Sequence, residues 1–396
     1  MSAQPERLFY SHDKFVDRAY EVRLLIDKAR RLAAGSHEEN RVVIFHGMRG
    51  AGKTWLLHEI GYQLKQTLSN VLTVYLDLGE FSDTPVNNAL QAIVCRIRDA
   101  IESKTGPSPF WVRGDERLEA LTGMLLSSVR RMGVLVLLFD YVDESPHELL
   151  ALLEDRCLAP LAVLPSVLII LAGRGREYIW KSPELRLKSE ERDLAHFDLP
   201  STLEQLKKQV PQPAPPADEI QPLSAGYPWS NYILGANPAN RADALDKIVE
   251  YLLSGLPVSK NDRDHLEALC VLRMFSDEMI PSMFAAYFND PTYQTLGYRQ
   301  RREARQALVR AALVRWGEQR GGYQIDEALS HVLENRLYER DRATWERLHT
   351  AARDLFREWT ETYPRTAARW QKEVEYHKGR LTHGPLWTPD GQEEKQ

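Results

Sequence analysis

The chain of 396 residues is too long for a single hydrophobic core, so roughly two to four domains are expected. Its 51 Lys and Arg residues face 56 Asp and Glu residues, and the net charge of −5 does not support wholesale binding to nucleic acid or to a membrane surface. The sequence has no bilayer-spanning apolar run and no secretory leader, and its three cysteines have no metal or redox spacing. We therefore expect a cytoplasmic protein with inert thiols.

The first predicted element is an amphipathic helix within residues 8–34. The short segment Phe15-Val16-Asp17-Arg18 precedes its apolar face. A polar turn over residues 37–40 then leads into the next element.

The strongest pattern in the sequence lies within residues 41–57, which read RVVIFHGMRGAGKTWLL. Residues 41–45 are a short apolar run, which is typical of a strand buried on both faces. Residues 47–54 fit the phosphate-loop pattern G-x-x-x-x-G-K-[ST], and residues 55–64 have helical spacing. Strand, glycine loop and helix are the context that this pattern requires. The alternative is an ordinary glycine-rich turn before a helix.

The chemistry of a phosphate loop explains this spacing. Glycines let the backbone curl so that successive N–H groups point at an anion, and the helix that begins near Lys53 adds the positive end of its dipole. The ammonium group of Lys53 reaches the terminal phosphates, while the Thr54 hydroxyl holds Mg²⁺. We therefore expect the phosphates to be bound by Gly47, Met48, Arg49, Gly50, Ala51, Gly52, Lys53, Thr54 and Trp55.

A second chemical centre follows a strand over residues 71–78 and helices over residues 86–101 and 118–131. Residues 134–139 are an apolar strand that ends at Asp140, which is the Walker B arrangement of a Mg²⁺-binding carboxylate. A second acid orients the attacking water in such sites, and Asp143 and Glu144 are the candidates. Because Tyr141 stands directly after Asp140 where an acid would be expected, we expect slow hydrolysis.

Two more strands are predicted downstream of a helix over residues 146–161, one over residues 167–172 and a fifth over residues 194–199. Arg174 follows the first of these, where its guanidinium would meet the γ-phosphate, unless it is a loop arginine in solvent. Strands and helices alternate five times, so the sequence predicts an α/β fold with a parallel sheet and helices on both faces.

Composition changes after residue 200. A helix over residues 201–208, a Pro-rich stretch, the break at Gly226-Tyr227-Pro228 and a helix up to residue 253 indicate a helical lid domain. Three helices and a short hairpin follow, which is the winged-helix pattern, and then C-terminal helices and a polar tail. The predicted domains are residues 8–200, 201–257, 258–340 and 341–396.

The third helix of the predicted winged-helix domain begins with a basic run that contains Arg299, Arg301, Arg302 and Arg305. Acidic residues elsewhere in this domain roughly balance it. A solvated or interdomain helix face is therefore favoured over contact with DNA, and nucleic acid stays a possible but unfavoured partner.

The order of these motifs resembles the STAND class of signal-transduction P-loop ATPases, which includes the NACHT and NB-ARC proteins and is related to AAA+ proteins. The resemblance covers roughly residues 8–380. It implies that Val16 and Arg18 lie against the nucleotide base, that Arg174 is the arginine of the sensor strand and that Pro228 belongs to the lid motif. The family's glycine is Asp17 here. Asp326 stands where many members have a histidine that contacts ADP.

The resemblance further implies an ATP/ADP-bound, Mg²⁺-dependent switch that oligomerises in signalling or defence. The effector and sensor domains that the family normally carries would be on a partner chain. One alternative is a DNA-binding loader similar to the origin-recognition ATPases. Another is a small-molecule kinase, which is disfavoured because a winged helix would have no role there.

Overall fold

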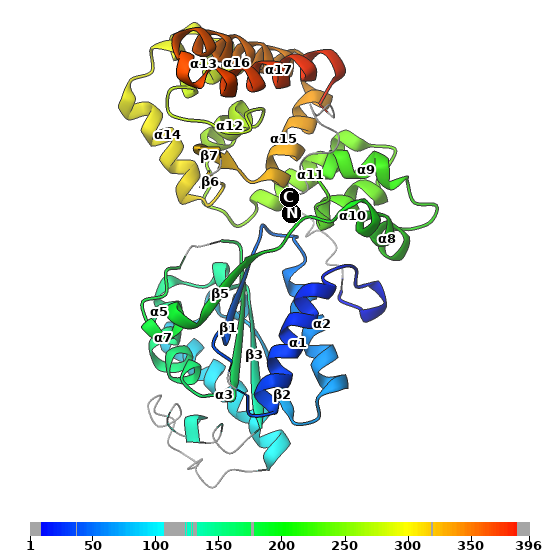
Figure 1. Cartoon of the computed structure of the whole chain (residues 1–396), viewed down its shortest axis with the longest axis vertical. Helices are drawn as coiled ribbons and strands as arrows, with labels where there is room; N and C mark the ends of the chain where they lie inside the picture. The colour runs from blue at the N-terminus through cyan, green and yellow to red at the C-terminus, as the bar shows by residue number, and fades with distance from the viewer. Residues whose placement is uncertain are drawn as a thin grey trace. The chain divides into compact units, whose positions relative to one another are not determined.

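The computed structural model describes most of the chain, namely residues 9–36, 38–106, 123, 125–127, 129, 133–175, 178–317 and 320–385 (Figure 1). It forms two compact units, of which the first ends at Ala195 and the second begins at His196. The predicted helix over residues 118–131 lies largely outside the described residues, as does the predicted polar tail.

The first unit contains a five-stranded parallel sheet in the order β2-β3-β4-β1-β5. The strand that carries the phosphate loop is β1, the strand that ends at Asp140 is β3, and β4 lies between them. In chain order, the strands and main helices are α1 (Ala19–Ala33), β1 (Val42–His46), α2 (Lys53–Thr67), β2 (Val71–Asp77), α3 (Val86–Thr105), β3 (Val134–Asp140), α5 (His147–Leu153), α6 (Ala159–Ala162), β4 (Val167–Gly173), α7 (Pro183–Lys188) and β5 (Ser189–Asp193).

Helices cover both faces of this sheet, as the alternating pattern of strands and helices predicts (Figure 1). Every residue of β1, β3 and β4 is buried, so these strands read as continuous apolar runs and not as alternating ones. Successive side chains of the strands alternate between two cores. One core is shared with α1 and α2, and the other with α3, α5 and α6.

The prediction of the fifth strand is wrong in position. The strand is β5, with the sequence SEERD, and it pairs with β1 through Val42↔Ser189 to His46↔Asp193. This edge strand has no apolar run because its side chains are only partly buried. Glu190 forms an ion pair with Lys28 at 3.4 Å, and Glu191 lies 3.7 Å from His46. The predicted strand over residues 194–199 is an irregular connection, although Leu194 and Phe197 are buried.

The second unit begins with helices that surround the Gly226-Tyr227-Pro228 turn, namely α8 (Leu199–Gln209), α9 (Ala217–Ser224), α10 (Pro228–Ala236) and α11 (Arg241–Leu253). The helix that we predicted to start at Ser201 starts at Leu199, because the Asp198 side chain caps it by accepting from the Ser201 N–H at 2.9 Å. A buried polar network then fixes the turn. Asn231 donates to Gln205 at 3.0 Å, and Gln205 donates to the Pro228 carbonyl at 2.8 Å.

Gly226 is the residue in this turn that tolerates the least change. Its φ is +71°, and a Cβ there would lie 2.0 Å from the Phe197 carbonyl oxygen. We expect Gly226→Ala to destabilise the second unit by about 3 kcal/mol or more, since strain from the left-handed backbone adds to the overlap. Chemical denaturation measures this loss.

The matched control is Gly35→Ala. Gly35 also has a positive φ, +74°, but no atom lies within 4 Å of its added Cβ. We expect this change to cost about 1 kcal/mol, the backbone strain alone. Equal losses for the two variants would show that the contact with Phe197 is unimportant.

The rest of the second unit contains the predicted three helices and hairpin and then a helical C-terminal region. The elements are α12 (Lys260–Leu269), α13 (Ile280–Phe288), α14 (Tyr298–Arg310), β6 (Val314–Gly317), β7 (Gly322–Ile325), α15 (Glu327–Arg340), α16 (Arg342–Thr362) and α17 (Ala367–His383). The strands β6 and β7 pair in antiparallel fashion. Among the described residues, no helix has the length and apolar character needed to cross a membrane.

Charged and titratable side chains are buried where α15, α16 and α17 meet. The Nδ1 atoms of His349 and His377 lie 2.8 Å apart, and the Nε2 atom of His349 lies 3.2 Å from a carboxylate oxygen of Glu334. The guanidinium of Arg380 lies 3.4 Å from the same carboxylate. Burial lowers the pKa of His377 well below its usual value, and the nearby positive charges of Arg273 and Arg380 contribute to the same shift.

This cluster predicts that acid destabilises the second unit. A histidine whose pKa is lower in the folded than in the unfolded chain contributes stability above its unfolded pKa of about 6.5, and that stability is lost as the pH falls. Burial also lowers the pKa of His331 on α15. We expect the unfolding free energy to fall by up to about 1.4 kcal/mol per pH unit for each such histidine below pH ~6.5. Denaturation followed by near-UV circular dichroism at a series of pH values measures this slope, which should be shallower in His377→Phe.

Candidate nucleotide-binding site

The phosphate loop lies between the end of β1 and the start of α2, as its pattern requires. Gly50 and Gly52 have φ values of +96° and +91°, in the left-handed region that glycine adopts without strain. Gly52 is the N-cap of α2, so Lys53 and Thr54 stand in the first turn. The N–H groups at the start of a helix and the helix dipole make this loop suited to an anion.

Lys53 folds back onto its own loop. Its ammonium group is largely buried and donates to the carbonyl oxygens of Gly47 at 2.5 Å and Met48 at 3.0 Å. Phosphate oxygens are charged acceptors, and charge-assisted hydrogen bonds to them are roughly twice as strong as neutral ones. Lys53 is therefore placed to replace its hydrogen bonds to two loop carbonyls with hydrogen bonds to a phosphate.

Asp140 lies at the end of β3 and is only 1% exposed. Its carboxylate accepts hydrogen bonds from the Thr54 hydroxyl, from the Tyr75 hydroxyl at 2.9 Å and from the Tyr141 N–H at 2.9 Å. Burial raises the pKa of Asp140, and these hydrogen bonds and the charge of Lys53 oppose that shift. The structure thus brings the two predicted metal ligands, Thr54 and Asp140, into contact.

These two side chains fit Mg²⁺. A hydroxyl and a carboxylate are hard oxygen ligands, and Mg²⁺ in nucleotide sites is held by one or two protein groups while phosphates and waters supply the rest. Among the residues that the structure describes, no group of three or more His, Cys, Asp or Glu side chains is arranged as a metal site. A metal that arrives with the nucleotide needs no such group.

Arg174 and Asp143 form an ion pair with each other at the same edge of the sheet. The Nε of Arg174 lies 3.0 Å from Asp143, and both side chains are less than 10% exposed. The Arg174 carbonyl also accepts from the Gly47 N–H at 3.1 Å, which joins the end of β4 to the start of the phosphate loop. Glu144, the other candidate for positioning water, is exposed.

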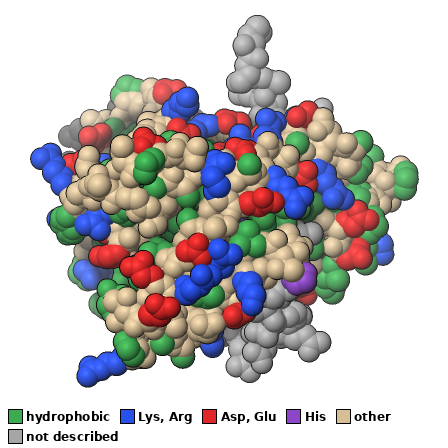
Figure 2. Space-filling model, turned by 90° about the horizontal axis from the view of Figure 1, so that it is seen from above, with side chains coloured by type: hydrophobic (Ala, Val, Ile, Leu, Met, Phe, Trp, Pro, Cys, Tyr) green, Lys and Arg blue, Asp and Glu red, His purple; other side chains and the backbone are tan. Residues whose placement is uncertain are grey.

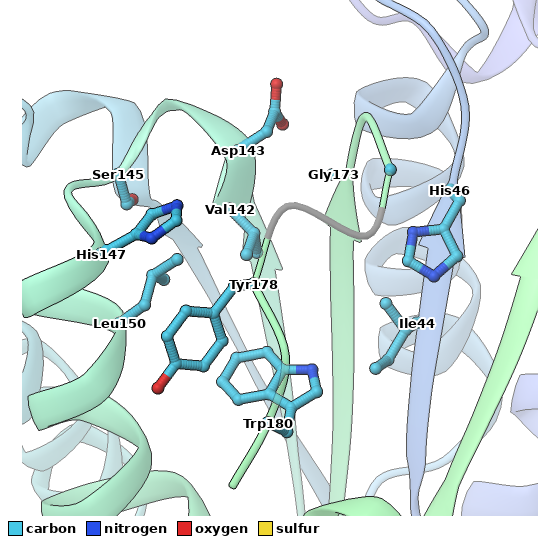
Figure 3. A pocket seen from close by; sticks show the side chains of 11 residues that line it. Ile44, His46, Val142, Asp143, Ser145, His147, Leu150, Gly173, Tyr178 and Trp180 are labelled. Carbon is cyan, nitrogen blue, oxygen red and sulfur yellow. The ribbon is translucent and has the colours of Figure 1, made fainter. Parts of the chain in front are cut away.

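A small cavity of about 30 Å³ lies beside this ion pair (Figure 3). His46 from the end of β1, Gly173 from the end of β4 and Asp143 line one side, while the Tyr178 and Trp180 rings, with centroids 4.8 Å apart, lie below them. This volume suits one or two waters and is about a tenth of an ordinary ligand pocket. The cavity is therefore too small for the nucleotide.

The residues that the resemblance assigns to the base are buried. Val16 is 4% exposed and Arg18 is 5% exposed. Asp17 has a φ of +61°, a conformation in which glycine is unstrained and Asp is tolerated. The difference from the family's glycine is thus compatible with the same backbone. That Val16 and Arg18 contact the nucleotide base remains a prediction.

Two further predicted positions lie in the second unit. Pro228 is the first residue of α10, held by the polar network around Asn231. Asp326 is the N-cap of α15, where its carboxylate accepts from the N–H groups of Ala328 and Leu329 at 3.1 and 3.3 Å. A helix cap therefore accounts for this residue without any nucleotide contact.

Sequence reasoning missed Tyr75 as a contact of Asp140. Tyr75 is on β2, which pairs with β3 so that Asp77 lies opposite Asp140. The sequence does place a tyrosine two residues before the end of β2. That position indicates a contact with Asp140 only once β2 is known to pair with β3.

Comparison with known proteins is informative only at the level of structure. A search of protein-family models and a search of curated proteins both found no match. The ADP form of the ORC2 protein of Aeropyrum pernix is similar in structure, with a TM-score of 0.50, 13% identity, and coverage of 87% of this chain and 97% of that chain.

Two other similarities are more distant. The RuvB Holliday junction branch migration motor of Thermotoga maritima has a TM-score of 0.38 and 16% identity over 81% of this chain and 95% of that one. A STAND protein with a tetratricopeptide repeat sensor from Pyrococcus horikoshii has a TM-score of 0.31 and 13% identity, and the match covers 93% of this chain and 53% of that one.

The similarity to ORC2 extends over most of both chains and so supports the overall fold. The narrower resemblance to the STAND class has no such support and remains a prediction. The chain therefore has a P-loop NTPase fold similar to that of ORC2, a parallel five-stranded sheet with helices followed by a helical C-terminal region.

Proposed function

We propose that this protein is an ATP-binding switch that hydrolyses ATP slowly in the presence of Mg²⁺. The observation that carries the proposal is the contact between Thr54 and Asp140 beside Lys53, which brings together the metal and phosphate groups of a P-loop ATPase. Lys53 binds the terminal phosphates, and Thr54 and Asp140 hold Mg²⁺, which neutralises the charge that develops on the phosphates.

Slow hydrolysis follows from the groups around Asp140. Tyr141 has a left-handed backbone, with φ +56°, and offers no base. Asp143 pairs with Arg174, so part of its carboxylate is already occupied, which makes it a weaker candidate for orienting water. Glu144 is exposed. A site without a well-placed base suits a switch whose nucleotide lasts longer than a metabolic turnover.

The finer role that we propose is that of a STAND-type switch in a signalling or defence complex. In this role the bound nucleotide controls the position of the winged helix and the formation of a homo-oligomer. Val16, Arg18 and Pro228 would contact the nucleotide, and a separate chain would supply the sensor or effector.

Mass photometry of the purified protein without nucleotide, with ADP and with a non-hydrolysable ATP analogue tests the switch. We expect a larger assembly with the ATP analogue than with ADP, and no such change for Lys53→Ala. The same mass distribution in all three states would contradict a nucleotide-controlled oligomer.

DNA binding is the other candidate function, and the structure reduces the positive charge available for it. Arg305 lies 2.7 Å from Asp277, with both side chains about 15% exposed, and Arg299 lies 2.8 Å from Glu303. On the face shown in Figure 2, basic and acidic side chains are interspersed. We therefore expect weak binding in a gel-shift assay. Tight, salt-sensitive binding that Arg301→Glu/Arg302→Glu abolishes would favour a DNA loader instead.

A further inference from the structure

We infer that Tyr75 is a positioning residue for the magnesium ion, acting through Asp140. The assignment rests on the proposed function, because it concerns the same metal site. The observation behind it is the hydrogen bond that the Tyr75 hydroxyl donates to Oδ2 of Asp140 at 2.9 Å.

Asp140 is held at both of its oxygens. Oδ1 accepts from the Tyr141 N–H at 2.9 Å, and Oδ2 accepts from Tyr75. Each carboxylate oxygen can accept two hydrogen bonds or bonds to a metal, so two positions remain beyond these donors; the Thr54 hydroxyl bonds to one of them, and the other is left for Mg²⁺ or for a water bound to it. Two donors at opposite ends of the carboxylate fix its rotation and thereby the direction of the remaining positions.

Tyr75 is itself held in place. It projects from β2, and its ring packs beside His58 of α2, with ring centroids 4.4 Å apart and planes at 26°. The Tyr10 ring also stacks on His58, with centroids 5.3 Å apart. The phenol is therefore fixed between the sheet and the helix that begins with Lys53 and Thr54.

The Tyr75 group remains a donor under all physiological conditions. Burial raises its pKa strongly, and the negative charges of Asp140 and Asp77 raise it further. Burial lowers the pKa of His58, which the charges of Asp140 and Asp77 only partly offset.

Outer contacts of this kind commonly contribute about 10- to 100-fold to metal affinity. Tyr75→Phe removes the hydroxyl but keeps the ring that stacks on His58. We expect it to raise the Mg²⁺ concentration for half-maximal tightening of nucleotide binding about 10-fold. The affinity for the nucleotide in EDTA should stay within about twofold of wild type, because the phosphate loop is untouched.

The experiment titrates a fluorescent ATP analogue into wild type, Tyr75→Phe and Tyr62→Phe, in EDTA and at a series of Mg²⁺ concentrations. Tyr62→Phe is the matched control, since it removes a hydroxyl from a ring of α2 that stacks on His12, with centroids 4.4 Å apart. It should behave as wild type in both conditions.

Two results would overturn the assignment without overturning the proposed function. One is an unchanged Mg²⁺ dependence in Tyr75→Phe, and the other is an equal loss of affinity in EDTA, which would mark a packing role. Failure of the wild-type protein to bind the analogue at all would overturn the proposed function together with this assignment.

Discussion

Lys53→Ala should abolish ATP binding at micromolar concentrations, with a loss of affinity of about 100-fold or more. In the proposed site the Lys53 ammonium would donate to the phosphates, and a hydrogen bond to a charged group contributes about 1.5–3 kcal/mol. Loss of two such bonds, to the β- and γ-phosphates, accounts for the size of the effect. Equilibrium titration with a fluorescent ATP analogue measures it.

Lys53 also bonds to the loop carbonyls of Gly47 and Met48, so the variant must be checked for folding. Arg49→Ala is the matched control because Arg49 is a partly exposed cation of the same loop. This control tests whether loss of any positive charge from the loop weakens ATP binding to the same extent. If Lys53→Ala bound ATP as tightly as wild type while remaining folded, the phosphate site would be elsewhere.

Asp140→Asn should retain nucleotide binding in EDTA but lower ATP hydrolysis by about 100-fold. The substitution keeps the size of the side chain and removes the charge that attracts Mg²⁺. Steady-state phosphate release at saturating ATP and Mg²⁺ measures the loss. Because wild-type turnover is expected to be slow, single-turnover conditions allow a larger decrease in the hydrolysis rate to be measured.

Asp77→Asn is the control for Asp140→Asn. Asp77 lies opposite Asp140 on the neighbouring strand, but its carboxylate accepts from the Gly79 N–H at 2.9 Å and so caps the turn after β2. We expect its hydrolysis rate to stay within about threefold of wild type. Equal losses for the two variants would point to a general effect of negative charge at this edge, and the Walker B role of Asp140 would be wrong.

The sequence predicts the central strands of the sheet because burial on both faces requires continuous apolar runs, which β1, β3 and β4 have. It does not predict β5 correctly, because an edge strand needs only backbone pairing on one side, and the charged segment SEERD is only partly buried, with Glu190 paired to Lys28. The apolar residues Leu194 and Phe197 that suggested the strand are buried in an irregular connection instead.

The candidate site could likewise be predicted only in part from the sequence. Lys53, Thr54 and Asp140 follow from local patterns, since each pattern carries its own chemistry. The ion pair between Arg174 and Asp143 does not, because it joins residues that follow two different strands and depends on the strand order. Tyr75 was missed for the same reason.

The most direct measurement of the central claim is a crystal structure of the protein with Mg²⁺ and a non-hydrolysable ATP analogue. We expect the β- and γ-phosphates in the loop formed by residues 47–54, Lys53 turned from the carbonyls of Gly47 and Met48 to the phosphates, and Mg²⁺ beside Thr54 and Asp140. A nucleotide bound elsewhere, with Lys53 still bonded to those two carbonyls, would contradict the account.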